Sequence, residues 1–508
     1  MAHPKSIYLE NRKNLEWLNE KMILKMRELY NTRFVMIGVD DKKNFLSSWL
    51  NKNDYYYGID SLGIEADRSK PENISAIYMS ANKYEKKYGI TYMRDGILQD
   101  RSFAYNFVHN KVENFVSKNT LSYEEIVNRQ NYFFDYAEKL FRDKKIDLVI
   151  ARPDSLLGFA VTTVAKHLNI PVTVQSTTRV NSYMYWTYGA YMQSNQISDN
   201  IKKLKQDKVK IEDPNLNEKI ASHSFKDRAN LIRELSLKSL ANEIIYILKD
   251  SLNWFIKDIK KGRLGKRVSI FTRMSKKIKA YREHCYLQSI FEGDINIIKK
   301  DKFIYFPLPT EPEFNTHSLC KEFLNTHAMI QQIAISLPTG YNLVIKEHTP
   351  NIGQKPRDFY TRLKKIPNLI IANYLIPGPQ MVDSAEAIVT VAGSSAIEAA
   401  EKGKMAVVLA SSSEYFCLPN IILGHSMRDM PKILLQALKK VSAEKRQDIM
   451  YEANLYKQVL KKIGYYAPDT PPFHGKNTKI LDKELKKAIE ELIIVWKLQK
   501  SNSSIKAK

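Results

Sequence analysis

The chain has 508 residues, 44% of them hydrophobic, which is enough for two or three globular domains. Its 79 Lys and Arg residues against 55 Asp and Glu residues give a formal net charge of +24, which favours polyanionic partners such as phosphorylated substrates, anionic membranes or nucleic acid. Three widely spaced cysteines argue against a disulfide framework or a CxxC metal site, and without an apolar leader or a run of ~20 apolar residues we expect a cytoplasmic protein.

The first 200 residues alternate short β-branched runs with helical segments. Candidate strands lie at 33–38, 147–151 and 171–175, and helical spacing is seen over 123–144 and 155–168. The connections from 147–151 through 155–168 to 171–175 are short, which favours a right-handed βαβ unit. We therefore predict a Rossmann-like domain over residues 1–200.

Polar residues follow two of these candidate strands. Arg152-Pro153-Asp154 comes after 147–151, and Asp40-Asp41 comes after 33–38. An aspartate in such a place either acts as a base toward an incoming hydroxyl or caps the following helix. We include Asp154 among the predicted catalytic residues.

Residues 201–300 have helical periodicity, few turn signals and concentrated positive charge. Between Lys257 and Arg282 there are eleven Lys or Arg residues and one acid, Asp258, directly after the apolar, aromatic-bearing segment 244–256. This predicts a helical insertion whose surface is a solvated face, an amphipathic contact with anionic lipid, or a nucleic-acid contact. We carry forward the anionic membrane as the predicted partner and expect no nucleic acid.

The stretch 303–409 has the strongest pattern. Five runs of strand length alternate with mostly amphipathic segments, at 303–307, 342–346, 368–372, 387–391 and 405–409. This alternation is typical of a parallel, doubly wound sheet, in which ligands bind outside the carboxyl ends of the strands. We predict a second Rossmann-like domain over 301–465.

Lys346-Glu347-His348 stands directly after the second of these runs. Three adjacent ionisable groups are costly to bury without partners, so they belong either to a ligand site or to a hydrated loop. A histidine there can donate to a departing phosphate, and Lys346 can offset phosphate charge. No second histidine or carboxylate follows at ligand spacing, so we expect no metal.

The turn Gly393-Ser394-Ser395 follows the fourth run and opens a helix. Its amides and the positive end of the helix can hold a phosphate, and the alternative is an ordinary turn with a capping serine. Glu398, farther into that helix, either reaches a ribose hydroxyl or is exposed. In the loop after the first run, Thr310 is a predicted phosphate contact and Glu311 a predicted catalytic carboxylate, unless that loop simply faces water.

The C-terminal region, 466–508, begins with a Pro-rich segment. A helix is expected over 478–498, followed by a polar tail, and we expect this helix to return to the first domain. The chain has no G-x-G-x-x-G fingerprint, Walker spacing or G-x-S-x-G elbow, which argues against dehydrogenase, P-loop ATPase and hydrolase functions.

Several segments of the second α/β region, taken together, resemble the capsular polysaccharide biosynthesis family of bacteria. That family includes surface-polysaccharide glycosyltransferases and transferases of 3-deoxy-manno-octulosonic acid. The similar segments are 306–313, 333–340, 341–348, 360–368, 383–398 and 403–404. The resemblance extends weakly over 147–188 and leaves the insertion unmatched. Two departures are Thr349, inserted before Pro350, and Glu311-Pro312-Glu313 where the family has Gln-Pro-Glu.

The resemblance implies a GT-B-like architecture, with two Rossmann-like domains facing across a cleft and the donor nucleotide held by the C-terminal one. It implies that His348 and the Gly393-Ser394-Ser395 turn contact the donor phosphate, and that Glu398 lies near the nucleoside. No obligatory metal is implied, and the nucleotide sugar is a co-substrate rather than a cofactor.

We therefore expect a membrane-associated glycosyltransferase that moves a sugar from a nucleotide-sugar donor to a growing bacterial surface glycan. Lys346, Glu347 and His348 are predicted donor-side residues, and Asp154 is predicted to assist the acceptor. Two alternatives stay open. One is a polyol-phosphate transferase of GT-B type, and the other is a non-catalytic polysaccharide assembly factor.

Overall fold

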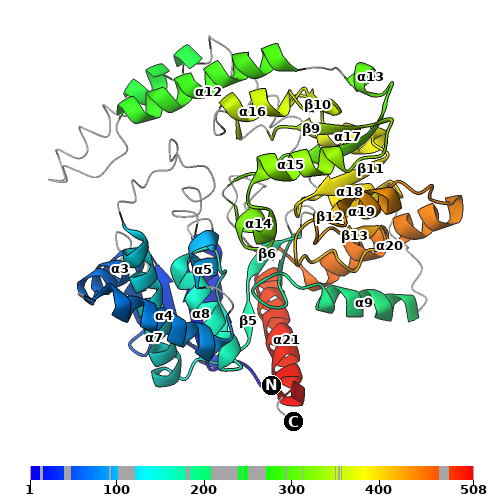
Figure 1. Cartoon of the computed structure of the whole chain (residues 1–508). Helices are drawn as coiled ribbons and strands as arrows, with labels where there is room; N and C mark the ends of the chain where they lie inside the picture. The colour runs from blue at the N-terminus through cyan, green and yellow to red at the C-terminus, as the bar shows by residue number, and fades with distance from the viewer. Residues whose placement is uncertain are drawn as a thin grey trace.

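The computed structural model describes residues 2–11, 15–38, 47–71, 73–90, 93–100, 121–178, 183–206, 238, 240–242, 244–249, 270–291, 295–311, 313–348, 351–352, 355, 357–467 and 480–506. Two parallel sheets form the centres of two Rossmann-like domains, coloured blue to cyan and green to orange in Figure 1. The fold is α/β and GT-B-like, as the sequence predicted. Much of the insertion, including 207–237 and 250–269, lies outside the described residues.

The first sheet has five parallel strands in the order β3-β2-β1-β4-β5. The strands are β1 (Ser6–Glu10), β2 (Arg33–Gly38), β3 (Tyr55–Gly58), β4 (Leu148–Ile150) and β5 (Val172–Thr173). The sequence predicted β2, β4 and β5 but missed β1 and β3. β1 is the central strand and is buried along most of its length, yet its apolar run of three residues is too short to identify by pattern.

Helices cover both faces of this first sheet. They are α1 (Glu16–Tyr30), α3 (Ile59–Arg68), α4 (Ile74–Tyr88), α5 (Arg94–Gln99), α7 (Tyr123–Asp143) and α8 (Leu156–His167). α7 begins at a capping box, in which the Glu125 N–H donates to Ser122 Oγ (3.2 Å) and the Ser122 N–H donates to Glu125 Oε2 (2.7 Å). Phe133, Phe134, Phe141 and Phe159 of α7 and α8 pack into one core with Tyr8 of β1.

The second sheet has six parallel strands in the order β10-β9-β8-β11-β12-β13. The strands are β8 (Lys302–Pro307), β9 (Tyr341–Lys346), β10 (Leu369–Ala372), β11 (Ala387–Thr390), β12 (Ala406–Val408) and β13 (Ile421–Leu423). The first five match the five predicted runs. β13 was missed because it has only three residues.

The second sheet is also flanked by helices. They are α13 (Ile295–Ile298), α14 (Phe314–His317), the short 3-10 helix η4 (Lys321–Phe323), α15 (Thr326–Ile335), α16 (Arg357–Leu363), α17 (Gly378–Ser384), α18 (Ser395–Glu401), α19 (Met430–Ala437) and α20 (Ala443–Ile463). The strand residues Phe303 to Phe306 are almost fully buried among them, as a sheet covered on both faces requires.

Two segments outside 301–465 also belong to this second core. α9 (Asn195–Gln206) buries Ile197 and Ile201 in it, although the predicted first domain ran to residue 200. α12 (Ile270–Ile290), from the predicted insertion, buries Leu287 there and lies along α16, where Tyr286 Oη and Thr361 Oγ1 are 2.7 Å apart (Figure 1).

A third, small sheet and the last helix join the two halves. Its strands are β6 (Gln175–Thr177), β7 (Tyr183–Trp186) and β14 (Tyr465–Tyr466), in the order β14-β7-β6. α21 (Asp482–Lys506) then packs against the first domain. Trp186 Nε1 donates to the Ala488 carbonyl (2.7 Å) and Trp496 Nε1 donates to the Asp147 carbonyl (3.0 Å).

Both ends of the described chain meet at Asp147. Its carboxylate accepts the Lys5 N–H (2.9 Å) and forms an ion pair with Lys500 Nζ (3.6 Å). The return of the final helix to the first domain therefore agrees with the position expected from the sequence (Figure 1). In the described residues no helix combines the length and apolar character needed to cross a membrane.

A buried carboxyl on α21 makes stability depend on pH. Burial raises the pKa of Glu491 from its usual 4.5 to about 7. Between these two values the folded chain binds more protons than the unfolded chain, so this group lowers stability as pH rises through that window. We expect Glu491→Gln to raise the melting temperature at pH 8 by about 2 °C relative to the wild type, with less gain at pH 5.

The matched control is Glu490→Gln, which makes the same change on an exposed neighbour in α21. Thermal unfolding of the three proteins at both pH values provides the comparison. An equal effect of Glu491→Gln at pH 5 and pH 8 would contradict the prediction.

Candidate active site

The carboxyl ends of β8, β9 and β11 lie at one edge of the second sheet. β8 pairs in parallel with both neighbours, so that Pro307 stands opposite Lys346 and Tyr305 opposite Ile388. The chain winds from β8 out to β10 and resumes at β11 on the other side, which makes the β8–β11 junction the topological switch point. The segments at and after these three carboxyl ends carry all the predicted donor residues.

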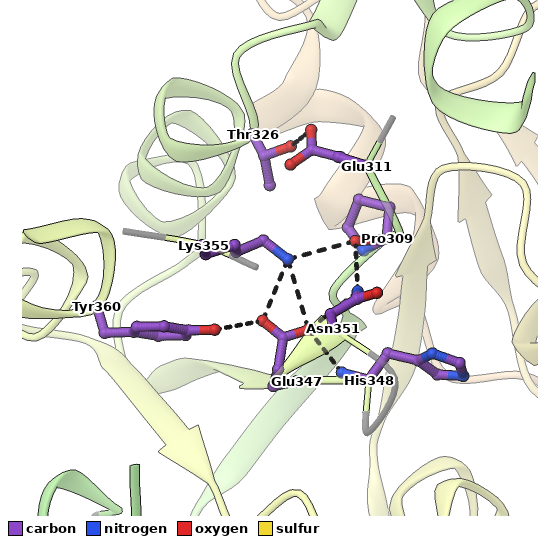
Figure 2. A network of polar contacts seen from close by, with 8 residues as sticks. All are labelled: Pro309, Glu311, Thr326, Glu347, His348, Asn351, Lys355 and Tyr360. Atoms are coloured by element: carbon purple, nitrogen blue, oxygen red, sulfur yellow. Dashed lines mark hydrogen bonds and ion pairs between the residues drawn. The ribbon is translucent and has the colours of Figure 1, made fainter. Parts of the chain in front are cut away.

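His348 lies two residues beyond the end of β9 and is half-buried. Its backbone N–H donates to Glu347 Oε1 (2.7 Å), and its carbonyl accepts the Asn351 N–H (2.8 Å). Figure 2 shows the imidazole extending away from Glu347, Lys355 and Tyr360. The ring is therefore directed away from the charged cluster, while the backbone is tied into it.

Glu347 is the centre of that cluster, with only 1% of its surface exposed. Oε2 accepts from Tyr360 Oη (2.6 Å) and Lys355 Nζ (3.1 Å), and Oε1 accepts from Asn351 Nδ2 (3.2 Å) (Figure 2). Burial next to this carboxylate raises the pKa of Tyr360 well above its usual value, so the phenol stays a donor. Lys355 is itself buried and forms the ion pair.

The predicted phosphate-binding role of Glu347 does not fit this geometry. The carboxylate is enclosed by donors of the protein, and its negative charge would repel a phosphate. Lys346 is also buried, and its carbonyl accepts the Leu308 N–H (3.0 Å), which joins the end of β9 to the loop after β8. Thr349 and Pro350 lie outside the described residues.

In the loop after β8, Glu311 is buried, whereas Thr310 is half-buried. The Thr326 hydroxyl of α15 donates to Glu311 Oε1 (Figure 2). One oxygen of the enclosed Glu311 carboxylate thus links this loop to α15, and the catalytic role of Glu311 stays a prediction. Thr310 stays a predicted phosphate contact.

The turn after β11 leaves hydrogen-bond donors available. Gly393 N–H donates to Thr390 Oγ1 (3.1 Å), and Ser394 Oγ donates to Glu398 Oε1 (3.2 Å) instead of capping the helix. Ser395 is 8% exposed, and its hydroxyl is buried without a partner in the described residues. Within the same described part, the N–H groups of Ser394 and Ser395 also have no hydrogen-bond acceptor.

Glu398 is half-buried in the first turn of α18. The hydroxyl of Ser394 bonds its carboxylate, so Glu398 borders the turn as predicted for a nucleoside contact, and that role stays a prediction. Gly403, with φ +64°, ends the helix region, and a side chain there would collide with Arg446.

In the first domain, Asp154 does not cap the following helix. Ser155 is the cap, since its Oγ accepts the Gly158 N–H (2.9 Å). The Asp154 side chain is half-buried in the loop after β4, so a catalytic role there is still a prediction. Asp40 and Asp41 lie outside the described residues.

Asp154 lies beside a contact between the two domains. Ser318 Oγ donates to the Pro153 carbonyl (3.2 Å), and the Arg152 guanidinium lies 5.0 Å from the centre of the Phe314 ring. Nearby, Lys321 Nζ and Asp95 Oδ2 form an ion pair at 2.5 Å. The segment after β8 therefore carries donor-side residues and also contacts the loop of Asp154.

A small pocket that the sequence analysis did not predict lies at the carboxyl edge of the first sheet. It is lined by Glu10, Leu15, Asn19, Ile150, Ala151, Arg152, Val174 and Gln175. Asn19 is buried, and its Oδ1 accepts no hydrogen bond from the described residues. Glu10 could have been found from the sequence only if residues 6–10 had been recognised as a strand, because Glu10 would then stand at its carboxyl end.

In the described ranges, no group of three or more His, Cys, Asp and Glu side chains is arranged to hold a metal ion. The N–H groups of Ser394 and Ser395 and the Ser395 hydroxyl at the turn after β11 are donors that suit an anion, with the Glu398 carboxylate beside them.

No protein-family model matches the chain, and no curated protein matches it in sequence. Among solved structures it is similar to UDP-GlcNAc 2-epimerase from Neisseria meningitidis bound to UDP-GlcNAc, with 12% identity, a TM-score of 0.28, and 90% of this chain and 99% of that chain covered. The Methanocaldococcus jannaschii UDP-GlcNAc 2-epimerase in complex with UDP-GlcNAc and UDP shows 14% identity, a TM-score of 0.26, and coverage of 88% and 98%.

A third similar structure is the glycotransferase of kitacinnamycin, with 9% identity, a TM-score of 0.25, and coverage of 90% and 96%. These similarities are too low to transfer a residue role or a substrate to this chain. The fold assignment rests on the strand orders of the two sheets.

The turn after β11 has no room for a side chain at Gly393. A Cβ there would lie 2.7 Å from Thr390 Oγ1, closer than such atoms approach. We expect Gly393→Ala to lower the free energy of unfolding by about 1–3 kcal/mol, measured by urea unfolding, because the turn must shift.

Gly378→Ala is the control, since a Cβ at Gly378 meets nothing within 4 Å. Equal free energies of unfolding for Gly393→Ala and Gly378→Ala would contradict the close approach of Thr390 Oγ1 to position 393.

Proposed function

We propose that this protein is a glycosyltransferase that uses a nucleotide-sugar donor. The observation that carries the proposal is the convergence of two loops on the switch point of the second sheet. One loop contributes the Ser395 hydroxyl and the N–H groups of Ser394 and Ser395, which have no hydrogen-bond partner among the described residues, and the other contributes His348. Donors gathered at a switch point suit the phosphate of a nucleotide.

The chemistry proposed for this site is stabilisation of a leaving phosphate. As the bond from the sugar to the phosphate oxygen breaks, negative charge grows on that oxygen. Fixed amide and hydroxyl donors at the β11 turn offset this charge, and the His348 imidazole donates a hydrogen bond to the phosphate. No step requires a metal ion.

The acceptor is proposed to approach from the first domain. Asp154 is adjacent to the contact between the domains, and Glu10 lines the pocket at the edge of the first sheet. Either carboxylate can take the proton of an incoming hydroxyl, and Glu10 joins Asp154 as a candidate for this role.

The acceptor class follows from the family resemblance. The similarity of the segments around His348 and Gly393 to the capsular polysaccharide biosynthesis family supports a bacterial surface glycan as the acceptor. A protein with this task works in the cytoplasm at the inner face of the membrane, where lipid-linked glycans are extended.

The function is tested by nucleotide binding and by turnover. We expect a thermal-shift panel of CMP, UDP and GDP to raise the melting temperature with one nucleotide above the others, because a ligand that binds the folded state stabilises it. With the matching nucleotide sugar, His348→Ala is expected to lower kcat by about 100-fold or more and to leave the melting temperature nearly unchanged.

His425→Ala is the control, since His425 is exposed and far along the chain from this site. Near-normal turnover of His348→Ala would reject the role assigned to the imidazole. Turnover of nucleotide-activated glycerol or ribitol instead of sugars would identify a polyol-phosphate transferase, and nucleotide binding without product under several acceptors would favour an assembly factor.

We also propose that the insertion contacts an anionic membrane. Ile245, Tyr246 and Leu248 are exposed on one short helical segment, and Phe271 at the start of α12 is 83% exposed. The surrounding sequence 257–282 carries eleven basic residues and one acid. Apolar side chains beside concentrated positive charge suit the surface of an anionic bilayer.

Phe271→Ser is therefore expected to weaken binding to anionic vesicles several-fold in a sedimentation assay, and added salt should weaken wild-type binding. The control is Ile335→Ser, which removes another exposed apolar side chain (65%) from α15 in the second domain. Equal partitioning of both variants and the wild type would refute a lipid contact by this segment.

A further inference from the structure

The buried ion pair between Glu347 and Lys355 connects the two loops that flank the candidate donor site. Lys355 Nζ donates to the Glu347 carboxylate and also approaches the Pro309 carbonyl (3.4 Å). Asn351 Nδ2 likewise bonds both Glu347 Oε1 and the Pro309 carbonyl, each at 3.2 Å (Figure 2). One cluster thus holds the loop of His348 and the loop of Thr310 and Glu311 together.

Four hydrogen bonds converge on the Glu347 carboxylate. Its two oxygens accept from Tyr360 Oη, Asn351 Nδ2, Lys355 Nζ and the His348 N–H. Loss of this carboxylate would leave these donors without their common acceptor and would release the His348 backbone.

Lys355 is the counter-charge of this buried group. Removing one partner of a buried ion pair is destabilising, because it leaves the other charge buried alone. Lys355 Nζ lies 3.1 Å from the Glu347 carboxylate and 5.6 Å from the centre of the Phe359 ring.

We infer that Lys355 and Glu347 are positioning residues that set the place of the His348 backbone relative to the loop after β8. Neither residue touches the donor in this role. The inference rests on the proposed function for its effect on turnover, but its effect on His348 is measurable without any substrate.

The test is Lys355→Met, which removes the charge and keeps an unbranched side chain of similar reach. The first measurement is the pH titration of the His348 ring signal in histidine-labelled protein by NMR, assigned with His348→Gln. At pH 7 the His348 signal should be displaced from its wild-type position.

The second measurement is turnover of the donor identified by the nucleotide panel. We expect kcat of Lys355→Met to fall about tenfold to 100-fold at pH 7, in the range seen when a supporting residue of an active site is removed. Lys365→Met, the same change at an exposed lysine, should match the wild type at every pH.

A double variant keeps the test decisive if Lys355→Met does not fold. Glu347→Gln with Lys355→Met removes both charges, so neither is buried alone. We expect a displaced His348 signal and a reduced kcat in this variant as well. A wild-type His348 signal in either folded variant would overturn the inference.

Failure of this inference is distinguishable from failure of the proposed function. If the wild type turns over no nucleotide sugar, the proposed function fails, while the NMR titration still decides whether Lys355 positions His348. If the wild type turns over its donor and Lys355→Met shows a wild-type His348 signal at pH 7, only the positioning inference fails.

Discussion

The parallel pairing of β8 with both β9 and β11 is the constraint on which the candidate site depends. Parallel neighbours end at the same edge, so residues that are about 40 positions apart along the chain, such as Thr310, His348 and Gly393, are brought to one place. The β8 core residues from Phe303 to Phe306 are buried on both faces, which holds this central strand firmly. A slip of one residue in either pairing would turn the strand's side chains to the opposite face.

The two domains contain similar strand-to-helix turns with opposite chemistry. At the start of α8, the Asp100 carboxylate accepts the Leu156 N–H (2.9 Å) and Ser155 caps the helix. At the start of α18, Ser394 bonds Glu398, and the Ser395 hydroxyl has no partner in the described residues. The Asp100 carboxylate thus occupies the turn before α8, whereas the turn before α18 retains available donors. For this reason we place the proposed anion in the second domain.

Neighbouring ionisable residues of the β9 loop also differ in their surroundings. Three consecutive ionisable residues looked equivalent in the sequence, yet Glu347 turns into the protein toward Lys355 and Tyr360, and the His348 ring extends away from them (Figure 2). A buried anion with a buried counter-charge stiffens the loop, because breaking the pair would leave a lone charge in a dry environment. This rigidity suits a site that must hold donors in position before charge develops.

The sequence by itself determined the α/β class, the five runs of the second sheet and the location of polar residues beyond their carboxyl ends. β-branched runs and helical periodicity are local properties, so they can be recognised without tertiary contacts. The same reasoning found α8 and the final helix. It missed β1, β3 and β13, whose short or mixed sequences become strands only because neighbouring strands supply hydrogen bonds.

Tertiary structure alone decided which charged side chains face inward. Lys355 and Tyr360 lie eight and thirteen residues beyond Glu347, and no spacing rule links them to it. Likewise Thr326 encloses Glu311, Asp100 occupies the start of α8, and Glu10 reaches a pocket through a strand that the sequence did not reveal. Whether an ionisable side chain faces inward depends on burial and on partners far along the chain. These are properties of the packed protein rather than of its local sequence.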